Sequence, residues 1–191
     1  MIYAAVFHIT SQLNQFLKRS FDLNEDIVVV SNIVEQDGSI ATNVANRIVA
    51  SLINIEKDTA PGGRPITAPR EGQPSAASYP PVHTNLYLLF AGNFNGKNYA
   101  EALKFLSHTI SFFQRNPLFT QQNSPELDHR IAKLSLDIEN LNIKDLSSLW
   151  SVLSGKYLPS VLYKIRMITF DAQDITTRVP KLVEPKTIAA S

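Results

Sequence analysis

The stretch from Leu141 to Phe170 restricts the possible folds of this chain more than any other part of the sequence. Asn142 is a favourable N-cap residue, and Asp145 follows where a carboxylate faces the free amides of a first helical turn. The apolar residues of this segment recur at three- and four-residue steps and share one helical face: Ile143, Leu146, Leu149, Trp150 and Leu153. Because Gly155 is suited to end a helix, we predict a short amphipathic helix here.

A long strand is predicted directly after this helix. Residues 161–170 are rich in β-branched and aromatic side chains, and they follow a proline at position 159. One face would carry Val161, Tyr163, Ile165 and Met167, and the other would carry Lys164 and Arg166. The single tryptophan of the protein, Trp150, lies on the helix that leads into this strand. We therefore expect this helix–strand unit to form the core.

The N-terminal part of the sequence predicts one helix and two strands. Residues 2–19 form a helical pattern whose apolar stripe consists of Ile2, Val6, Ile9, Leu13, Phe16 and Leu17. Residues 27–35 are β-branched and suit a strand, and the polar residues 36–39 suit a turn. Residues 46–56 are compatible with a helix, but their β-branched density favours a second strand.

The middle of the chain predicts a central strand and a second helix. Residues 83–92 are apolar on both faces around Leu86 to Phe90, which is typical of a strand covered on both sides. Asn98 and Glu101 have the spacing of a capping box. The helix that follows would bury Tyr99, Leu103, Leu106, Ile110 and Phe113, and Pro117 would end it.

Residues 116–125 are predicted to be a loop, and residues 131–139 a half-exposed strand that buries Leu134, Leu136 and Ile138. The expected order is α-β-β-β-α-β-α-β. We therefore predict an α+β fold, with a mixed sheet of about five strands flanked by helices.

Two segments differ in composition from the rest of the chain. Residues 57–81 hold six of the 11 prolines and three of the seven glycines, which predicts a long loop. Arg64 and Arg70 in this loop are candidate partner contacts, although arginines in such loops are more often simply solvated. We divide the chain into a domain over 1–171 and an extended C-terminal arm over 172–191.

The predicted arm combines prolines with apolar residues. Pro180 and Pro185 exclude a regular helix, whereas four nearby residues are candidate partner contacts: Arg178, Lys181, Leu182 and Val183. We expect the arm to add as an extended strand to a partner. The alternative is a tail that folds back on its own domain or frays.

Composition excludes several classes of partner. The formal charge is +1, from 18 basic and 17 acidic residues, so no long-range field would attract nucleic acid or anionic lipid. The chain has no cysteine, which excludes disulfides and thiolate chemistry. Residues 1–19 lack the basic and uninterrupted apolar regions of a signal or membrane-spanning segment. We expect a soluble protein made in the cytosol.

No motif in the sequence predicts catalysis or a metal site. The four histidines, His8, His83, His108 and His129, have no second ligand at helical or zinc-finger spacing. The pair Gly62–Gly63 lacks the lysine and helix of a phosphate-binding loop. We predict no catalytic, metal or cofactor-binding residue. The competing hypothesis is a small-molecule-binding or catalytic α+β domain that uses residues 57–81 as a lid.

Three segments carry a resemblance to a known family. Residues 84–120, 126–150 and 149–170, the last reading LWSVLSGKYLPSVLYKIRMITF, resemble the cap or tail-terminator proteins of bacterial contractile injection systems. The systems concerned are phage-tail-like particles such as the antifeeding prophage and the Photorhabdus virulence cassettes. The resemblance extends over roughly residues 1–171 and is strongest from Asn85 onward.

This resemblance implies a structural protein without enzymatic activity and a fold similar to phage tail terminators. Such caps form a six-fold, homohexameric ring on the distal end of the inner tube, stop its growth and hold the last layer of sheath. The expected partners are further copies of this chain, the tube protein and the sheath protein, in a particle that is either released or anchored to the cell. A ring needs two different contact patches on each subunit, and residues 57–81 and 172–191 are the candidates.

Overall fold

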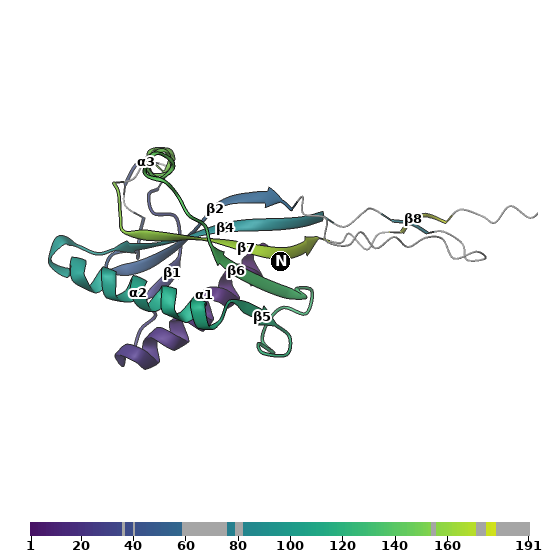
Figure 1. Cartoon of the computed structure of the whole chain (residues 1–191), viewed down its shortest axis with the longest axis horizontal. Coiled ribbons are helices and arrows are strands. Elements are labelled where there is room, and N and C mark those ends of the chain that lie inside the picture. The colour runs from purple at the N-terminus through teal and green to yellow at the C-terminus, as the bar shows by residue number, and fades with distance from the viewer. Residues whose placement is uncertain are drawn as a thin grey trace, which may run out of the picture.

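The computed structural model describes residues 1–35, 37–39, 41–58, 76–78, 82–153, 156–170 and 175–178, with backbone alone for 76–78, 167–170 and 175–178. The elements, shown in Figure 1, are α1 (Ile2–Phe21), β1 (Val28–Val30), β2 (Arg47–Lys57), β3 (Ala76–Ser78), β4 (Val82–Asn93), the 3₁₀ turn η1 (Gly96–Asn98), α2 (Tyr99–Arg115), β5 (Leu118–Thr120), β6 (Lys133–Ile138), α3 (Ile143–Val152), β7 (Ser160–Phe170) and β8 (Ile175–Arg178).

The described strands form a six-stranded mixed sheet in the order β1-β2-β4-β7-β6-β5, and a separate β3-β8 pair. β1 runs parallel to β2, and the other neighbours in the large sheet are antiparallel. The predicted α+β class and mixed, helix-flanked sheet are confirmed, with one strand more than expected in that sheet. No described helix combines the length and the apolar character needed to cross a membrane.

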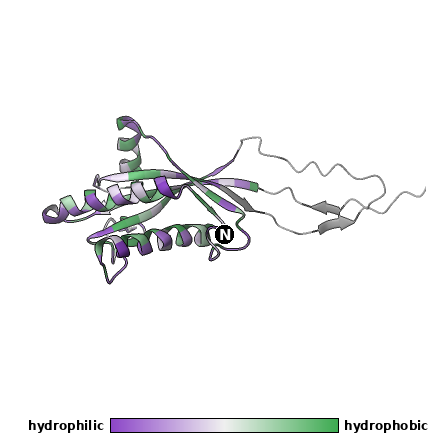
Figure 2. Cartoon of the chain, turned by 60° about the horizontal axis from the view of Figure 1, so that its bottom comes forward, coloured by the Kyte–Doolittle hydropathy of each residue, from purple (hydrophilic) through white to green (hydrophobic). Residues whose placement is uncertain are grey.

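The larger core lies between the sheet and the helices α1 and α2. β4 contributes Leu86, Leu88 and Phe90 to this core, and β7 contributes Tyr163 and Ile165. Both long helices alternate hydrophobic and hydrophilic residues around their axes (Figure 2), so each can bury one side against the sheet. Small residues let α2 come close to β4: a Cβ added at Gly92 would lie 3.0 Å from the Cβ of Ala102.

The opposite face of the sheet is covered by α3, which lies above it in Figure 1. Trp150 is 4% exposed and belongs to a second core cluster with Val49, Leu89 and Leu162. β4 is therefore covered on both sides, as predicted. The predicted N-cap is also confirmed, since Asn142 Oδ1 accepts a hydrogen bond from the Asp145 amide at 2.9 Å.

The expected role of the α3–β7 unit was only partly right. Trp150 is the only buried residue of α3, and Ile143, which the apolar stripe placed in the core, is 87% exposed. A helix that covers one end of a sheet face buries a narrow stripe, so the periodic residues at its margins stay in solvent. The main core instead belongs to α1, α2 and the sheet.

Seven strand or helix predictions correspond to observed elements: residues 2–19 to α1, 46–56 to β2, 83–92 to β4, the helix after Asn98 to α2, 131–139 to β6, the helix after Asn142 to α3 and 161–170 to β7. Two were wrong in extent. The strand expected over 27–35 is only three residues long, because the chain turns away from β2 after Val30. The loop expected over 116–125 contains β5, which pairs with β6.

The buried side of α2 differs from the predicted stripe. Tyr99, Leu103 and Ile110 are exposed, and the buried residues are Ala102, Phe105, Leu106, Thr109, Phe112 and Phe113. The reason is that α1 packs against α2 as well as against the sheet. Phe16 stacks on Phe112 at 5.1 Å between ring centroids, and Phe21 lies 4.7 Å from Phe105. The buried side is thereby rotated toward α1.

Two local predictions were also wrong. The capping box does not form, because the Asn98 side chain makes no cap bond and Glu101 instead pairs with Lys104 at 2.8 Å. The Asn95 Oδ1 caps the preceding 3₁₀ turn by accepting from the Asn98 amide at 3.1 Å. Ile138, expected in the core, is exposed at the end of β6.

Candidate assembly surface

The residues predicted to contact partners lie largely outside the described part of the chain. This holds for Arg64, Arg70, Lys181, Leu182 and Val183. Arg178 ends β8, of which the backbone alone is described. The candidate surface is therefore built from the described backbone of these segments and from the body of the domain.

Parts of the two predicted appendages are paired with each other. β3 comes from the segment 57–81 and β8 from the segment 172–191, and they are antiparallel, with Ala77 opposite Thr177. The pairing follows on from that of β4 and β7, whose last paired residues are Val82 and Phe170. Figure 1 shows this pair beyond the start of β4 and the end of β7, where Val82 and Phe170 lie. The predicted loop over 57–81 and the predicted arm over 172–191 thus share one strand pair.

One outer edge of the large sheet is closed by an asparagine side chain. Asn14, buried on α1, accepts hydrogen bonds at Oδ1 from the amides of Ile27 (3.0 Å) and Val28 (2.8 Å). Its Nδ2 donates to the Val28 carbonyl at 2.8 Å. The amide group therefore pairs with the outward backbone groups of β1 as a neighbouring strand would.

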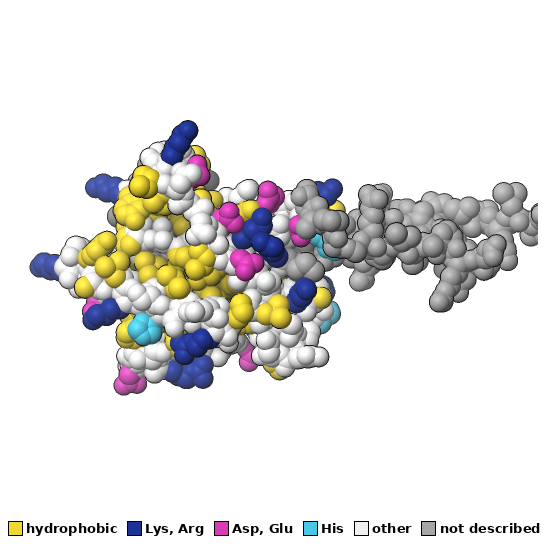
Figure 3. Space-filling model, viewed as in Figure 1, with side chains coloured by type: hydrophobic (Ala, Val, Ile, Leu, Met, Phe, Trp, Pro, Cys, Tyr) yellow, Lys and Arg dark blue, Asp and Glu magenta, His cyan; other side chains and the backbone are white. Residues whose placement is uncertain are grey.

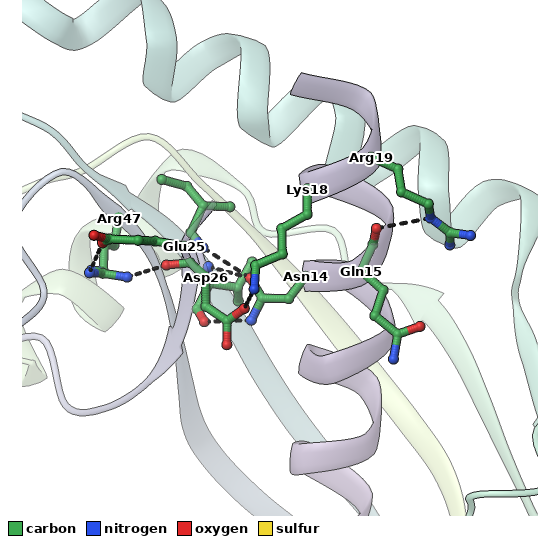
Figure 4. A network of polar contacts seen from close by, with 9 residues as sticks. Asn14, Gln15, Lys18, Arg19, Glu25, Asp26 and Arg47 are labelled. Carbon is green, nitrogen blue, oxygen red and sulfur yellow. Dashed lines mark hydrogen bonds and ion pairs between the residues drawn. The ribbon is translucent and has the colours of Figure 1, made fainter. Parts of the chain in front are cut away.

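Ion pairs surround this contact, as Figure 4 shows. Lys18 on α1 binds Asp26 at 2.7 Å, and Arg47 at the start of β2 binds Glu25 at 3.2 Å and the Asp26 carbonyl. Glu25 and Asp26 are thus engaged in holding the loop before β1. Their cationic partners Lys18 and Arg47 are partly buried, and Glu25, Asp26 and Arg47 line an open hollow of about 340 Å³.

The opposite edge of the sheet is closed in the same way. Asn123 Oδ1 accepts from the Thr120 amide at 2.7 Å, and Asn123 Nδ2 donates to the Leu118 carbonyl at 2.8 Å. Leu118 and Thr120 belong to β5, which is the end strand on this side of the sheet. Unpaired edge strands are ready templates for further strands. The two asparagines limit that possibility by occupying outward backbone groups of Val28 in β1 and of Leu118 and Thr120 in β5.

Apolar side chains gather on the surface between α3 and α2 (Figure 3). Tyr99, Leu103 and Ile110 of α2 are exposed. An open hollow of about 350 Å³ beside α3 is lined by Ile143, Leu146, Ser147, Trp150, Ser151 and Tyr157. Exposed apolar surface of this kind is typical of protein–protein contacts.

A second exposed apolar group lies on α1. Tyr3 and Phe7 are both exposed and stack on each other with ring centroids 5.7 Å apart. The α3 hollow and this aromatic pair lie on different layers of the fold, because α1 and α3 cover opposite faces of the sheet. The domain therefore presents two dissimilar apolar patches.

The described residues contain no group of three or more histidine, cysteine, aspartate or glutamate side chains that could hold a metal ion. His8 is buried against Phe119, with ring centroids 5.5 Å apart, and this burial lowers the pKa of its imidazole. His108 contacts Phe21, and the exposed His129 lies 3.9 Å from Asp128. Asp137 on β6 pairs with Arg166 on β7 at 3.6 Å.

Sequence reasoning missed the two asparagines that close the sheet. A signal was available for Asn14, because it lies among the apolar positions Leu13 and Leu17 of a predicted buried stripe, where a polar side chain needs a partner. Asn123 follows two glutamines in a polar loop, where nothing in the pattern distinguishes it.

The sequence matches the model of the family described as Pvc16 N-terminal domain over residues 8–184. Two solved structures are similar in fold. The sheath/tube terminator of the PVC extracellular contractile injection system, in its extended state, gives a TM-score of 0.53 at 14% identity, covering 96% of this chain and 64% of that one. The tube-terminating cap of the anti-feeding prophage gives a TM-score of 0.51 at 11% identity, and the match covers 95% of this chain and 59% of that one.

This chain therefore spans about three-fifths of the length of those two proteins. At such low identities the likeness establishes the fold, and it agrees with the fold predicted for tail terminators. No curated protein sequence matches this chain.

Proposed function

This chain belongs to the Pvc16 N-terminal domain family, and from that membership we propose that it is a structural cap protein that ends the tube of a phage-tail-like contractile injection system. The observation that carries the proposal is the agreement between the family match over residues 8–184 and the fold shared with two terminator proteins over at least 95% of this chain. The protein acts by binding other subunits and has no enzymatic role.

In this proposal the subunits form a homohexameric ring that binds the last layer of tube subunits and retains the last layer of sheath. A ring is built from heterologous contacts, in which two different patches of neighbouring subunits meet. The α3 hollow and the Tyr3–Phe7 pair are two such patches, and both are apolar and exposed. Their position on opposite layers of the fold supports head-to-tail contacts over a two-fold dimer.

Closed sheet edges support the same role. An end strand with free backbone groups would be a template for unregulated strand addition. Asn14 and Asn123 pair with outward backbone groups of the two end strands. Contacts between subunits are then left to the side-chain patches and to the part of β2 that β1 does not cover.

The alternative, a catalytic domain with residues 57–81 as a lid, has no supporting observation in the described part of the chain. The described hollows are open, and the exposed carboxylates Asp26 and Asp137 form ion pairs on the surface. The proposed particle carries this protein outside any membrane, either released or attached to the cell through other subunits.

Binding of the purified chain to isolated tubes tests the proposal. Gold-labelled protein should appear at one end of each tube in electron micrographs, and the species bound there should have a mass near six times 21.3 kDa. Labelling along the tube wall, or at neither end, would contradict a terminator. A monomer in free solution is compatible with it, because ring subunits can assemble on the tube alone.

A further inference from the structure

No described strand pairs with the outer edge of β2 over half of its length. β1 pairs with only three residues of β2, Ile48 to Ala50. The chain after β1 then leaves the sheet: the Ser31 amide donates to the Ala50 carbonyl at 3.2 Å, and the Ser31 carbonyl accepts from Ser51 Oγ at 2.5 Å. From Leu52 to Lys57, β2 pairs with β4 on one side and with no other described strand.

A groove of about 550 Å³ lies beside the start of this open edge. One wall is the turn that follows β1, and another is the end of α3 at Val152 and Leu153. Ser51, Leu52 and Ile53 of β2 all line it. Successive residues of a strand point to opposite faces, so a groove that touches three in a row runs along the edge of the strand rather than over one face.

A β-bulge shapes the same point. Leu52 is opposite Leu88 and Asn54 is opposite Tyr87, so Ile53 is an extra residue in β2. Bulges occur at sheet edges and next to binding sites, where they redirect side chains. Here the bulge lies where β2 enters the groove, and it divides the stretch covered by β1 from the open stretch.

The charges of the groove indicate what kind of segment it accepts. Glu35 and Asp37 are its only charged lining residues among those described, and both are exposed. Asp37 remains ionised, since the hydrogen bonds donated by the Ser39 hydroxyl and amide lower its pKa. The apolar lining comes from Ile33, Val34, Leu52, Ile53 and the end of α3. An extended peptide with aliphatic and basic side chains is complementary to such a groove.

We propose that residues 179–184 of a neighbouring copy of this chain bind in this groove as an added strand on the open edge of β2. The segment reads VPKLVE, which combines three aliphatic residues with Lys181 near its start and Glu184 at its end. Lys181 is the residue that would face the acidic side of the groove. Residues 181–184 lie between Pro180 and Pro185 and each carries a backbone amide that can bond to β2. This inference rests on the proposed ring, because the ring brings copies of the chain together.

Disulfide trapping tests this contact directly, since the natural chain has no cysteine. The Leu52→Cys and Leu182→Cys variants are mixed in assembled particles and oxidised. The matched control replaces Leu52→Cys by Leu118→Cys, because Leu52 is 38% and Leu118 41% exposed, and Leu118 lies on the edge closed by Asn123. We expect about tenfold more covalent dimer from the Leu52 pair than from the Leu118 pair, since docking raises the local concentration of the two thiols.

Equal dimer yields from both pairs would overturn the inference. So would a Leu52→Cys/Leu182→Cys double variant that closes only within one chain, because the segment would then bind its own domain. The Glu35→Lys variant should lower the trapping yield by about two- to fivefold, the range of an exposed ion pair, and Lys181→Glu in the partner should restore it. Glu126→Lys, at an exposed site outside the groove, is the control.

The same particles separate this inference from the proposed function. If tubes under reducing conditions are capped at their normal length while disulfide trapping fails, the proposed cap function is supported and the proposed strand addition is wrong. If the variants never appear on tubes at all, the proposed function itself has failed.

Discussion

Trp150 is the residue that joins α3 to the sheet. It is the only buried residue of this helix and contacts a cluster that includes Val49, Leu89 and Leu162. Its Nε1 has no hydrogen-bond partner among the described residues, so its contribution is the packing of the ring. We expect Trp150→Ala to lower the free energy of unfolding by about 3–5 kcal/mol. Denaturant unfolding followed by circular dichroism measures this.

A matched pair of variants distinguishes packing from other effects. Trp150→Phe keeps an aromatic ring and should cost only about 1–2 kcal/mol, because no hydrogen bond is lost. Val152→Ala, two residues away on the exposed side of α3, should change stability by less than about 0.5 kcal/mol. Equal stability of wild type and Trp150→Ala would show that α3 does not depend on this contact.

His8 makes stability depend on pH. Its burial lowers the pKa of the imidazole below the ordinary value of 6.5, so the unfolded chain binds a proton more readily than the folded one. Stability is therefore full above about pH 6.5 and falls as the pH drops below it, by at most about 1.4 kcal/mol per pH unit. We expect His8→Gln to remove this part of the loss between pH 7.5 and pH 5. An unchanged pH profile would mean that His8 is solvated.

Asn14 connects α1 to the sheet through three hydrogen bonds to Ile27 and Val28. The Asn14→Ala variant loses three hydrogen bonds and leaves the buried Val28 backbone groups without partners. We expect a loss of about 2–4 kcal/mol in the free energy of unfolding. The adjacent, exposed Gln15→Ala should stay within about 0.5 kcal/mol of wild type. If Asn14→Ala and Gln15→Ala have the same free energy of unfolding, the hydrogen bonds of Asn14 to Ile27 and Val28 do not stabilise the fold.

At the scale of elements, periodicity predicted the long helices and strands well. The doubly apolar run in residues 83–92 identified the central strand β4, and alternation identified β2 and β7. Short edge strands were the weak point. β1 and β5 have three residues each, which is too few for alternation to show. β5 in addition follows Pro117 directly, where a loop was the natural interpretation.

The side that a helix buries depends on all its neighbours, and the sequence of the helix alone does not contain them. The stripe through Leu103 and Ile110 was a reasonable prediction for α2 lying flat on a sheet. The aromatic contacts of Phe16 and Phe21 with α2 rotate the buried side toward α1. The result leaves apolar residues exposed, which a sequence pattern cannot tell from core residues.

The candidate surface was less predictable than the fold for a related reason. Arg64 and Lys181 were chosen from composition, and their contacts with partners stay predictions. The contact of Asn14 with β1 and the groove beside β2 each bring together residues that are separated in the chain. Asn14 bonds to Val28, and Glu35 and Leu52 line the same groove. Local patterns do not report such pairs.

The predicted arm can be tested as one element. Truncation after Asp171 removes β8 and leaves the six-stranded sheet complete. We expect the melting temperature of the remaining domain to stay within about 2 °C of wild type, whereas sheath retention in assembled particles is lost. Deletion of residues 59–80 removes β3, the partner of β8, and should cause the same loss of sheath.

A large fall in melting temperature after truncation would show that the arm belongs to the folded domain. Normal sheath attachment would show that the arm has no part in binding sheath. Sheath is scored by counting sheathed tubes in electron micrographs of particles purified from each variant strain.

At the scale of the whole molecule, the features of this domain fit a subunit that acts by binding other subunits. The sheet is closed at both end strands, the exposed apolar patches lie on opposite layers, and the open edge of β2 is bordered by a groove. The described ion pairs lie mainly on the surface. Such a domain presents several contact surfaces around one rigid core.

The length distribution of tubes with and without this protein tests the central claim most directly. A polymer end that binds a cap stops growing, whereas an uncapped end continues until subunits run out. We predict that particles from a strain lacking the protein have tubes and sheaths of uncontrolled length, or unstable sheaths, and that a plasmid copy restores one narrow length. Fully sheathed particles of normal length in the deletion strain would contradict the account.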